Sequence, residues 1–123
     1  MNTQTHDAAP IYSQFEAAMK KGDAHALTAL MTEDCTFENT FPAPDGTRVK
    51  GATAVSALMD EMFRSTKNPS FETEEIVTCG DRIVVRHKYS WDNADGTHGH
   101  VRGMDLMQLR DGKIREIFSY VKG

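Results

Sequence analysis

The residues GHVRGMDLMQLRDGKI, from Gly99 to Ile114, form the stretch that decides the fold. Two strand-like runs flank the dipeptide Asp111-Gly112, and Asp-Gly between alternating runs favours a tight β-hairpin. A single acid, Asp105, lies among methionine and leucine residues in the first run. Burying an unpaired carboxylate is costly, so Asp105 is either a reacting group in a pocket or a core polar group with a partner.

Outward from this hairpin, the hydrophobic period is two from Phe71 to Val121 and close to 3.6 before it. Pro10 suits the first turn of a helix, and Asp23 suits an N-cap. Helices grouped ahead of antiparallel strands predict an α+β fold, with the helices on one face of a curved sheet. The expected helices are 10–21, 23–31 and 52–65, and the expected strands are 35–39, 71–78, 82–91, 97–109 and 113–121.

The chain has 123 residues, which predicts one domain, residues 10–123, behind a disordered tail, residues 1–9. The net charge is -4 and no basic cluster occurs, which disfavours binding to nucleic acid. No apolar run approaches the ~20 residues of a membrane span, and the N-terminus has no secretory signal. We therefore expect a cytoplasmic protein without membrane contact.

Metal and thiol chemistry have little support in the sequence. The two cysteines, Cys35 and Cys79, lack a CxxC partner, and we interpret Cys35 as a small buried side chain. His98 and His100 alone supply too few ligands for a metal site, so we expect both to be solvated. No metal and no cofactor are predicted.

Strand alternation sorts the side chains into two faces. On strand 82–91, His87 shares the inward face with Ile83, Val85, Tyr89 and Trp91, and on strand 97–109 Asp105 shares it with Val101, Gly103, Met107 and Leu109. His87 and Asp105 should therefore point into the same cavity from adjacent strands, as a pair able to transfer protons. Met104 and Leu106 lie on the opposite face, and we expect a second subunit to cover them.

The order of these elements resembles the nuclear transport factor two-like superfamily, and most closely its SnoaL-like branch of polyketide cyclases and ketosteroid isomerase relatives. The resemblance covers residues 10–121 and rests on Gly22-Asp23, Leu30 to Asp34, Gly103-Met104-Asp105 and Asp111 to Glu116. It implies a cone-shaped, mostly antiparallel mixed sheet packed against three helices, a cystatin-like α+β roll. It also implies a pocket in the mouth of the cone and a homodimer through the outer face of the sheet.

The catalytic residues of that family carry over only in part. Where ketosteroid isomerases have a general base, this chain has Asn39, and where they have a tyrosine it has Phe15, with Tyr12 nearly one turn earlier. Their protonated aspartic acid matches Asp105. SnoaL-like cyclases resemble this chain better, because they use an aspartate at that position as acid and base. The same scaffold also carries dehydratases and epoxide hydrolases, so the fold alone does not fix the function.

We therefore expect a pocket for a small hydrophobic carbonyl or polyketide-like compound. The chemistry would be cofactor-free acid–base catalysis by an isomerase, cyclase or lyase, with Asp105 moving the proton and His87 assisting. The alternative is a non-catalytic ligand-binding domain, or a dimeric interaction domain, of the same fold. The candidate substrate-binding residues are Tyr12, Phe15, Asn39, Met59, Met62, Tyr89, Trp91 and Ser119.

Overall fold

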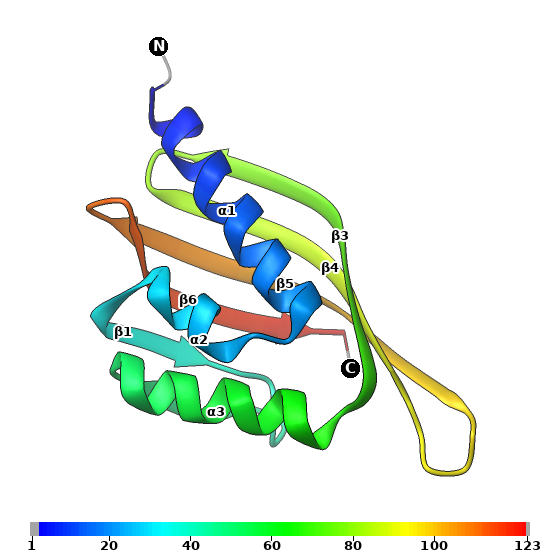
Figure 1. Cartoon of the computed structure of the whole chain (residues 1–123). Helices are drawn as coiled ribbons and strands as arrows, with labels where there is room; N and C mark the ends of the chain where they lie inside the picture. Colours follow the sequence, from blue (N-terminus) through cyan, green and yellow to red (C-terminus); the bar gives the residue numbers. More distant parts are fainter. Residues whose placement is uncertain (1–2, 123) are drawn as a thin grey trace.

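Three helices cover one face of a curved six-stranded sheet in the computed structural model (Figure 1). It describes the backbone of residues 3–122 and the side chains from Pro10 to Lys122. The helices are α1 (Thr3–Lys21), α2 (Ala24–Ala29) and α3 (Ala52–Ser65). The strands are β1 (Met31–Glu38), β2 (Arg48–Lys50), β3 (Lys67–Cys79), β4 (Arg82–Asp92), β5 (His98–Arg110) and β6 (Lys113–Val121). This is the predicted α+β class.

The helix boundaries follow from caps and apolar spacing. Asp23 is the N-cap of α2, because its Oδ1 accepts a hydrogen bond of 3.0 Å from the Ala26 amide. Helix α3 has the predicted bounds and buries Val55 and Met59, which lie one turn apart. Helix α1 begins at Thr3, so it takes in residues 3–9 of the predicted tail, and Pro10 lies inside it instead of in its first turn. Residues 1 and 2 lie outside the described part of the chain.

The strand order is β2-β1-β6-β5-β4-β3, and the pairing of β1 with β6 is parallel. All other neighbours are antiparallel, so the sheet is mixed, as expected. We did not predict β2, whose three residues are too few to show alternation. It pairs with β1 through Phe37 and Val49.

Strand β3 is longer than predicted, because Asn68-Pro69 does not separate it from α3. The strand begins at Lys67, and Asn68 adopts a positive φ of 48°. A bulge between Thr73 and Glu75 changes the register, so that Ile76 pairs with Val85. The bulge places Ile76 on the same face as Phe71 and Thr73, because their partners Val85, Tyr89 and His87 share one face of β4.

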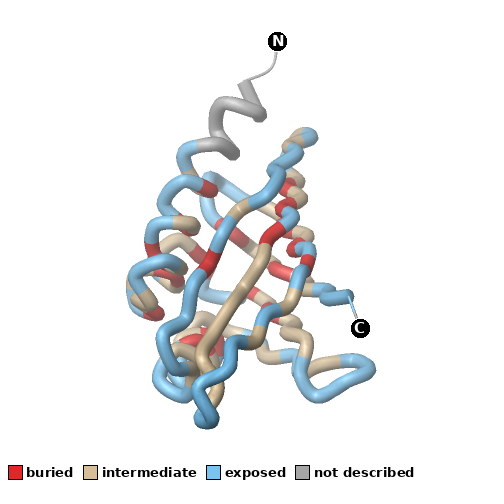
Figure 2. Tube along the Cα trace, turned by 90° about the vertical axis from the view of Figure 1, so that its right-hand side faces the viewer, coloured by how far each residue is buried: buried red, intermediate tan, exposed pale blue. Residues whose placement is uncertain are grey.

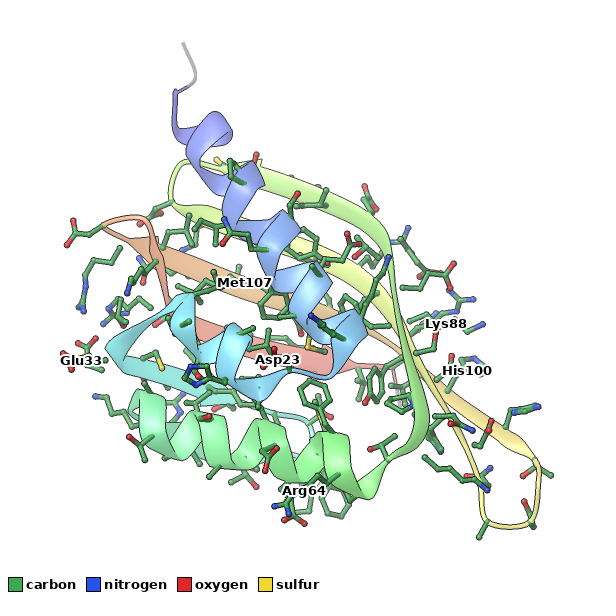
Figure 3. All side chains as sticks on the ribbon, viewed as in Figure 1. Asp23, Glu33, Arg64, Lys88, His100 and Met107 are labelled. Atoms are coloured by element: carbon green, nitrogen blue, oxygen red, sulfur yellow. The ribbon has the colours of Figure 1, made fainter. Side chains whose placement is uncertain are left out.

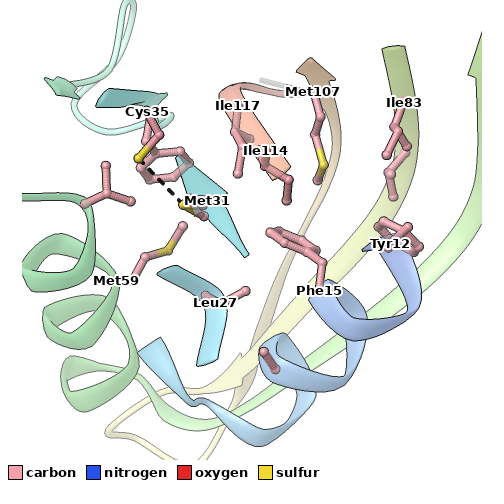
Figure 4. Packing of buried hydrophobic residues seen from close by; sticks show 14 of the residues in the cluster. Tyr12, Phe15, Leu27, Met31, Cys35, Met59, Ile83, Met107, Ile114 and Ile117 are labelled. Carbon is pink, nitrogen blue, oxygen red and sulfur yellow. Dashed lines mark hydrogen bonds between the residues drawn. The ribbon is translucent and has the colours of Figure 1, made fainter. Parts of the chain in front are cut away.

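The core lies between the helices and the inner face of the sheet. Phe15 on α1 packs toward Met107 of β5 and Ile114 of β6, and all three are at most 2% exposed (Figure 4). Cys35 is buried, as predicted, and its Sγ lies 3.9 Å from the Met31 sulfur. Figure 2 shows the exposed loops around this buried layer. None of the described helices is long and apolar enough to cross a lipid bilayer.

The outer face of the sheet carries ion pairs and a row of apolar side chains. In Figure 3, Met107 lies behind α1, whereas Lys88 and His100 lie at the periphery of the molecule. Arg86 and Arg102 both pair with Glu74 across the outer surface. The apolar row runs across four neighbouring strands through Val77, Val84, Leu106 and Phe118.

Candidate functional site

Three polar side chains from neighbouring strands meet on the inner face of the sheet. Asp105 of β5 lies opposite Ser119 of β6, and Ser119 Oγ donates a 2.7 Å hydrogen bond to Asp105 Oδ1. His87 of β4 brings its Nε2 to 3.3 Å from the same Oδ1. Asp105 is 6% exposed and His87 is 8% exposed. The acid is therefore a buried and partnered carboxylate, in the neighbourhood that strand alternation predicts.

The pairing assigns the hydrogen-bonding role of each ring nitrogen of His87. A carboxylate only accepts hydrogen bonds, so we assign the ring proton to Nε2, where it faces Asp105. Nδ1 is then an acceptor, and it is buried without a hydrogen-bond partner among the described residues. Phe71 packs against the imidazole with ring centroids 5.2 Å apart. Asp105 Oδ2 makes no hydrogen bond with the described part of the chain.

The pair opens into a cavity of about 120 Å³ beneath the helices. Its wall is mostly apolar, and it contains no lysine or arginine. The lining residues are Phe15, Met19, Phe37, Asn39, Thr40, Met59, Met62, Phe71, His87, Tyr89, Val101, Asp105, Ile117, Ser119, Tyr120 and Val121. A larger open hollow of about 900 Å³ lies between α2 and α3, but neither His87 nor Asp105 lines it. The smaller cavity is therefore the candidate site, because the buried ionisable groups His87 and Asp105 line it.

Tyr89 presents a second unpartnered polar atom at this cavity. Its hydroxyl is buried without a hydrogen-bond partner among the described residues. Burial raises the pKa of Tyr89, while the nearby Thr66 hydroxyl acts in the opposite direction. Thr66 itself donates to the Met62 carbonyl at 2.6 Å. The Tyr89 hydroxyl therefore stays protonated at neutral pH, with the Thr66 hydroxyl beside it as an acceptor.

Asn39 lines the cavity, but it also organises the loop that follows β1. Its Oδ1 accepts hydrogen bonds from the Thr47 amide at 2.7 Å and from the Phe41 amide at 3.3 Å. Only the amide NH2 of Asn39 is left to act on a ligand. This turn fixes the chain between β1 and β2.

Two of the predicted site residues lie outside the cavity wall. The Tyr12 hydroxyl makes a 2.5 Å hydrogen bond with Thr73 Oγ1, and burial raises the pKa of Tyr12 to about 12. Trp91 packs against Gly99 and donates from Nε1 to Asn93 Oδ1 at 3.1 Å. It lines a shallow outer hollow instead. The other eight predicted residues all line the cavity together.

Gly103 leaves the space that the imidazole ring of His87 occupies. It lies opposite His87, and a Cβ there would come within 3.0 Å of His87 Cε1 and 2.7 Å of the Tyr120 carbonyl oxygen. Phe71, which stacks on His87, was missed, although it is an apolar residue at the start of the period-two region. Among the side chains that the structure describes, no three His, Cys, Asp or Glu residues gather as metal ligands. His98 instead pairs with Asp92 at 2.7 Å.

Solved structures share this fold over nearly the whole chain. An NTF2-like protein of unknown function from Mesorhizobium loti is 38% identical, with a TM-score of 0.83 over 98% of this chain and 94% of that one. A protein from Jannaschia sp. CCS1, proposed to be a SnoaL-like polyketide cyclase, is 15% identical with a TM-score of 0.81, covering 95% and 86%. An LEH-like epoxide hydrolase from M. tuberculosis is also 15% identical, with a TM-score of 0.77, covering 95% and 84%.

The two more distant structures establish the fold alone. A search of curated proteins found no match. The family model for the SnoaL-like domain matches residues 12–117, which include α2, α3, strands β1 to β5, most of α1 and the first part of β6. The matched span contains His87 and Asp105. The chain belongs to the SnoaL-like domain family.

Proposed function

We propose that this protein catalyses cofactor-free proton transfer on a small hydrophobic carbonyl compound, as an isomerase, cyclase or lyase. The observation that carries the proposal is a buried carboxylate, Asp105, held by His87 and Ser119 against an apolar cavity. Buried ionisable groups paired inside a cavity are typical of acid–base sites.

In the proposed step, Asp105 Oδ2 takes a proton from the carbon next to the carbonyl group. The electron pair of that C–H bond moves into the new C=C bond, and the carbonyl oxygen becomes an enolate oxygen. When the substrate is a β,γ-unsaturated ketone, the product of this step is a conjugated dienolate, and return of the proton from Asp105 to its γ carbon moves the C=C bond and restores the carbonyl group, which completes an isomerisation without a co-reactant. A positioned general base of this kind contributes roughly 10²–10⁴-fold to the rate.

The remaining polar groups would stabilise the enolate and hold the base. The Tyr89 hydroxyl, or the free NH2 of Asn39, would donate to the oxygen where negative charge develops. His87 and Ser119 hold Oδ1 of Asp105, which leaves Oδ2 to face the substrate. The wall of Phe15, Met59 and Met62 would exclude water around the reacting carbon.

The test is exchange of the α-protons of small cyclic ketones for deuterium in D2O, followed by proton NMR. The wild-type protein should accelerate exchange for at least one ketone of benzene-like size. Asp105→Asn should lower that acceleration at least 100-fold while the far-UV circular dichroism spectrum stays the same. Equal exchange with both proteins would refute the role of Asp105.

A second candidate function is ligand binding without chemistry. It is favoured by Asn39, which stands where the isomerases have their base and whose oxygen is already engaged by the loop. In this case small cyclic molecules would bind in the cavity, as seen by NMR shifts of His87 and Tyr89, and no α-proton would exchange. Exchange above the buffer rate would exclude it.

We also propose that the outer face binds a second copy of this chain. Met104 is 41% exposed and Val77 is 51% exposed on this face. The ion pairs of Arg86 and Arg102 with Glu74 lie beside them, so a two-fold axis could place the positive groups of one copy opposite the negative groups of the other. Light scattering should give twice the chain mass, and Leu106→Glu should give the single mass. A monomeric wild-type protein at the same concentration would overturn this.

Both cysteines are free thiols, which fits our inference of a cytoplasmic protein.

A further inference from the structure

A second hollow lies beside the β4–β5 hairpin, which extends beyond the helices (Figure 1). Its volume is about 650 Å³, and its wall combines the loop after β1, the end of α3, the start of β3 and the hairpin itself. Among the described residues, only Tyr89 lines both this hairpin hollow and the cavity of His87 and Asp105. The proposed proton transfer uses no other residue of the hairpin hollow.

Phe41 reaches the hairpin hollow from the loop after β1. It is 77% exposed, more than any other large apolar side chain that the structure describes. Its backbone is fixed at both polar groups, because the amide donates to Asn39 Oδ1 at 3.3 Å and the carbonyl accepts from Thr47 Oγ1 at 2.9 Å. Exposed apolar groups that gather in one place mark interaction sites. An occupant of the hollow would therefore cover apolar surface that now faces water.

Trp91 presents a flat ring at the same hollow. It lies opposite Gly99, and a Cβ on Gly99 would come within 2.6 Å of Trp91 Nε1, so the indole rests on the β5 backbone. Trp91 Nε1 donates to Asn93 Oδ1, which leaves the indole no free polar group. Tyr89 packs beside Trp91 with ring centroids 6.2 Å apart. Aromatic rings arranged in this way favour a planar aromatic occupant.

The acid and the amide of the wall already have their partners. Asn68 Nδ2 donates to Asp92 Oδ2 at 2.8 Å, and His98 Nδ1 lies 2.7 Å from Asp92 Oδ1. Asn93 Nδ2 donates to Thr97 Oγ1 at 2.9 Å. Neither Asp92 nor Asn93 therefore has a free group that would hold a cationic occupant.

Lys67 is the charged side chain of the wall that is left without a partner. It lies opposite Asp92 in the β3–β4 ladder, but it is exposed and forms no ion pair with a carboxylate of the described residues. The hydroxyls of Ser65 and Thr66 both donate to the Met62 carbonyl, at 3.3 and 2.6 Å. An occupant thus meets aromatic rings and one unpaired cation.

From these observations we propose that the hairpin hollow binds a planar aromatic carboxylate, with its ring against Trp91 and Phe41 and its carboxylate paired with Lys67. About 150 Å³ is enough to hold benzene, so the volume of about 650 Å³ also admits two fused rings. This is a second site, so the proposal does not depend on the function of the inner cavity.

The test compares four probes by calorimetry. They are 2-naphthoate, neutral 2-naphthamide, saturated decahydro-2-naphthoate and cationic 2-naphthylmethylamine. The naphthoate should bind best, roughly twofold to fivefold more tightly than the amide because of the exposed ion pair. It should also bind roughly twofold to tenfold more tightly than the saturated acid because of stacking. The cationic amine should bind more weakly than the naphthoate.

NMR locates the bound probe. Trp91 is the single tryptophan of the chain, so its indole N–H signal reports directly on the hairpin hollow. The naphthoate should shift this signal and leave the ring signals of His87 unchanged, because His87 lines only the inner cavity.

Two variants assign the ring contact and the charge contact. Lys67→Gln should remove the advantage of the naphthoate over the amide and leave the affinity for the amide unchanged. Phe41→Leu keeps an apolar side chain but no ring, so it should reduce the advantage of the naphthoate over the saturated acid. Both side chains are exposed, so the fold should persist in the circular dichroism spectrum. Lys113→Gln is the matched control, an exposed lysine at the start of β6 outside the hollow, and should change no affinity.

The outcomes decide for or against this site. Tightest binding of the naphthoate, lost selectively in Lys67→Gln and reduced in Phe41→Leu, would support the proposal. No binding of the naphthoate at millimolar concentration, equal affinity for all four probes, or shifts at His87 in place of Trp91 would overturn it. A lower mass of Phe41→Ser than of the wild-type protein by light scattering would assign the hollow to a second copy of the chain and would also overturn it.

Discussion

His87 and Asp105 form a diagonal pair across β4 and β5, and are not direct cross-strand neighbours. His87 lies opposite Gly103, and Asp105 lies opposite Val85, yet Nε2 and Oδ1 are 3.3 Å apart. Diagonal neighbours on one sheet face are within reach of long or aromatic side chains. Because Gly103 has no side chain, the imidazole can lean along the sheet toward the acid.

This geometry predicts the effect of Gly103→Ala. The added methyl group would lie 2.7 Å from the Tyr120 carbonyl oxygen and 3.0 Å from His87 Cε1. The backbone oxygen cannot move cheaply, so we expect a loss of about 1–3 kcal/mol in the free energy of unfolding. The His87 ring should also turn away from Asp105, which urea denaturation and the NMR shifts of His87 would report.

Gly80→Ala is the matched control for that variant. Nothing lies within 4 Å of the methyl group that it adds, and its φ of +59° makes the change costly through the backbone alone. It should lower stability by about 1 kcal/mol and leave the His87 shifts unchanged. If Gly103→Ala leaves them unchanged too, the proposed space requirement is wrong.

Asp105→Asn should separate chemistry from folding. The amide has the same shape as the carboxyl group but is not a base, so α-proton exchange should fall at least 100-fold. Asp60→Asn is the control, because Asp60 is an exposed partner of Arg64 at 3.0 Å, and exchange should not change with it. Comparable losses in both variants would indicate a general effect of removing an acid.

Asn39 variants distinguish its loop role from a role on the substrate. Asn39→Ala removes the acceptor for the Thr47 and Phe41 amides, so the free energy of unfolding should fall by about 1–3 kcal/mol. Asn39→Asp keeps that acceptor oxygen but loses the NH2 donor, so it should retain most of the stability. If Asn39 acts on the ligand, the aspartate variant should still lose exchange activity. Full activity in Asn39→Asp would leave Tyr89 as the donor.

The raised pKa of Tyr12 predicts how stability changes at high pH. The pKa of its hydroxyl is raised from 10.0 to about 12, chiefly by burial. Between these values the unfolded chain releases the proton and the folded chain keeps it, so stability should fall as the pH rises through that window. Tyr12→Phe should reduce this dependence, as measured by the melting temperature against pH. An unchanged slope would show that the hydroxyl ionises alike in both states.

The ion pair between Asp34 and Arg110 predicts how stability changes at acidic pH. Arg110 donates to both carboxylate oxygens, at 2.6 and 3.1 Å, and lowers the pKa of Asp34 from 3.8 to about 2. The contribution of Asp34 is therefore present above its ordinary pKa and is lost as the pH falls toward 2. Arg110→Gln should flatten the melting temperature over that window, whereas Arg64→Gln, at another exposed pair, should not.

Much of the inner face follows from the sequence, because a strand alternates strictly. The period of two places His87 and Asp105 on the same side of adjacent strands before any contact is known. The pattern also gives the bounds of α3 and the N-cap at Asp23, since these depend on neighbouring residues. The resemblance to the SnoaL-like branch adds the mixed sheet and the cone.

The tertiary structure decided the relationships between residues that lie far apart in the sequence. The same alternation that placed His87 inward also predicted Trp91 there, but the β4–β5 hairpin extends beyond the helices (Figure 1), so Trp91 packs on Gly99 outside the cavity. Because α1 packs on β3, the Tyr12 hydroxyl forms a hydrogen bond with Thr73. The sequence by itself determined which face each side chain occupies, because alternation is a local property of the backbone. Only the packing of helices on the sheet decided which of those side chains share a cavity and which polar atoms there lack a partner.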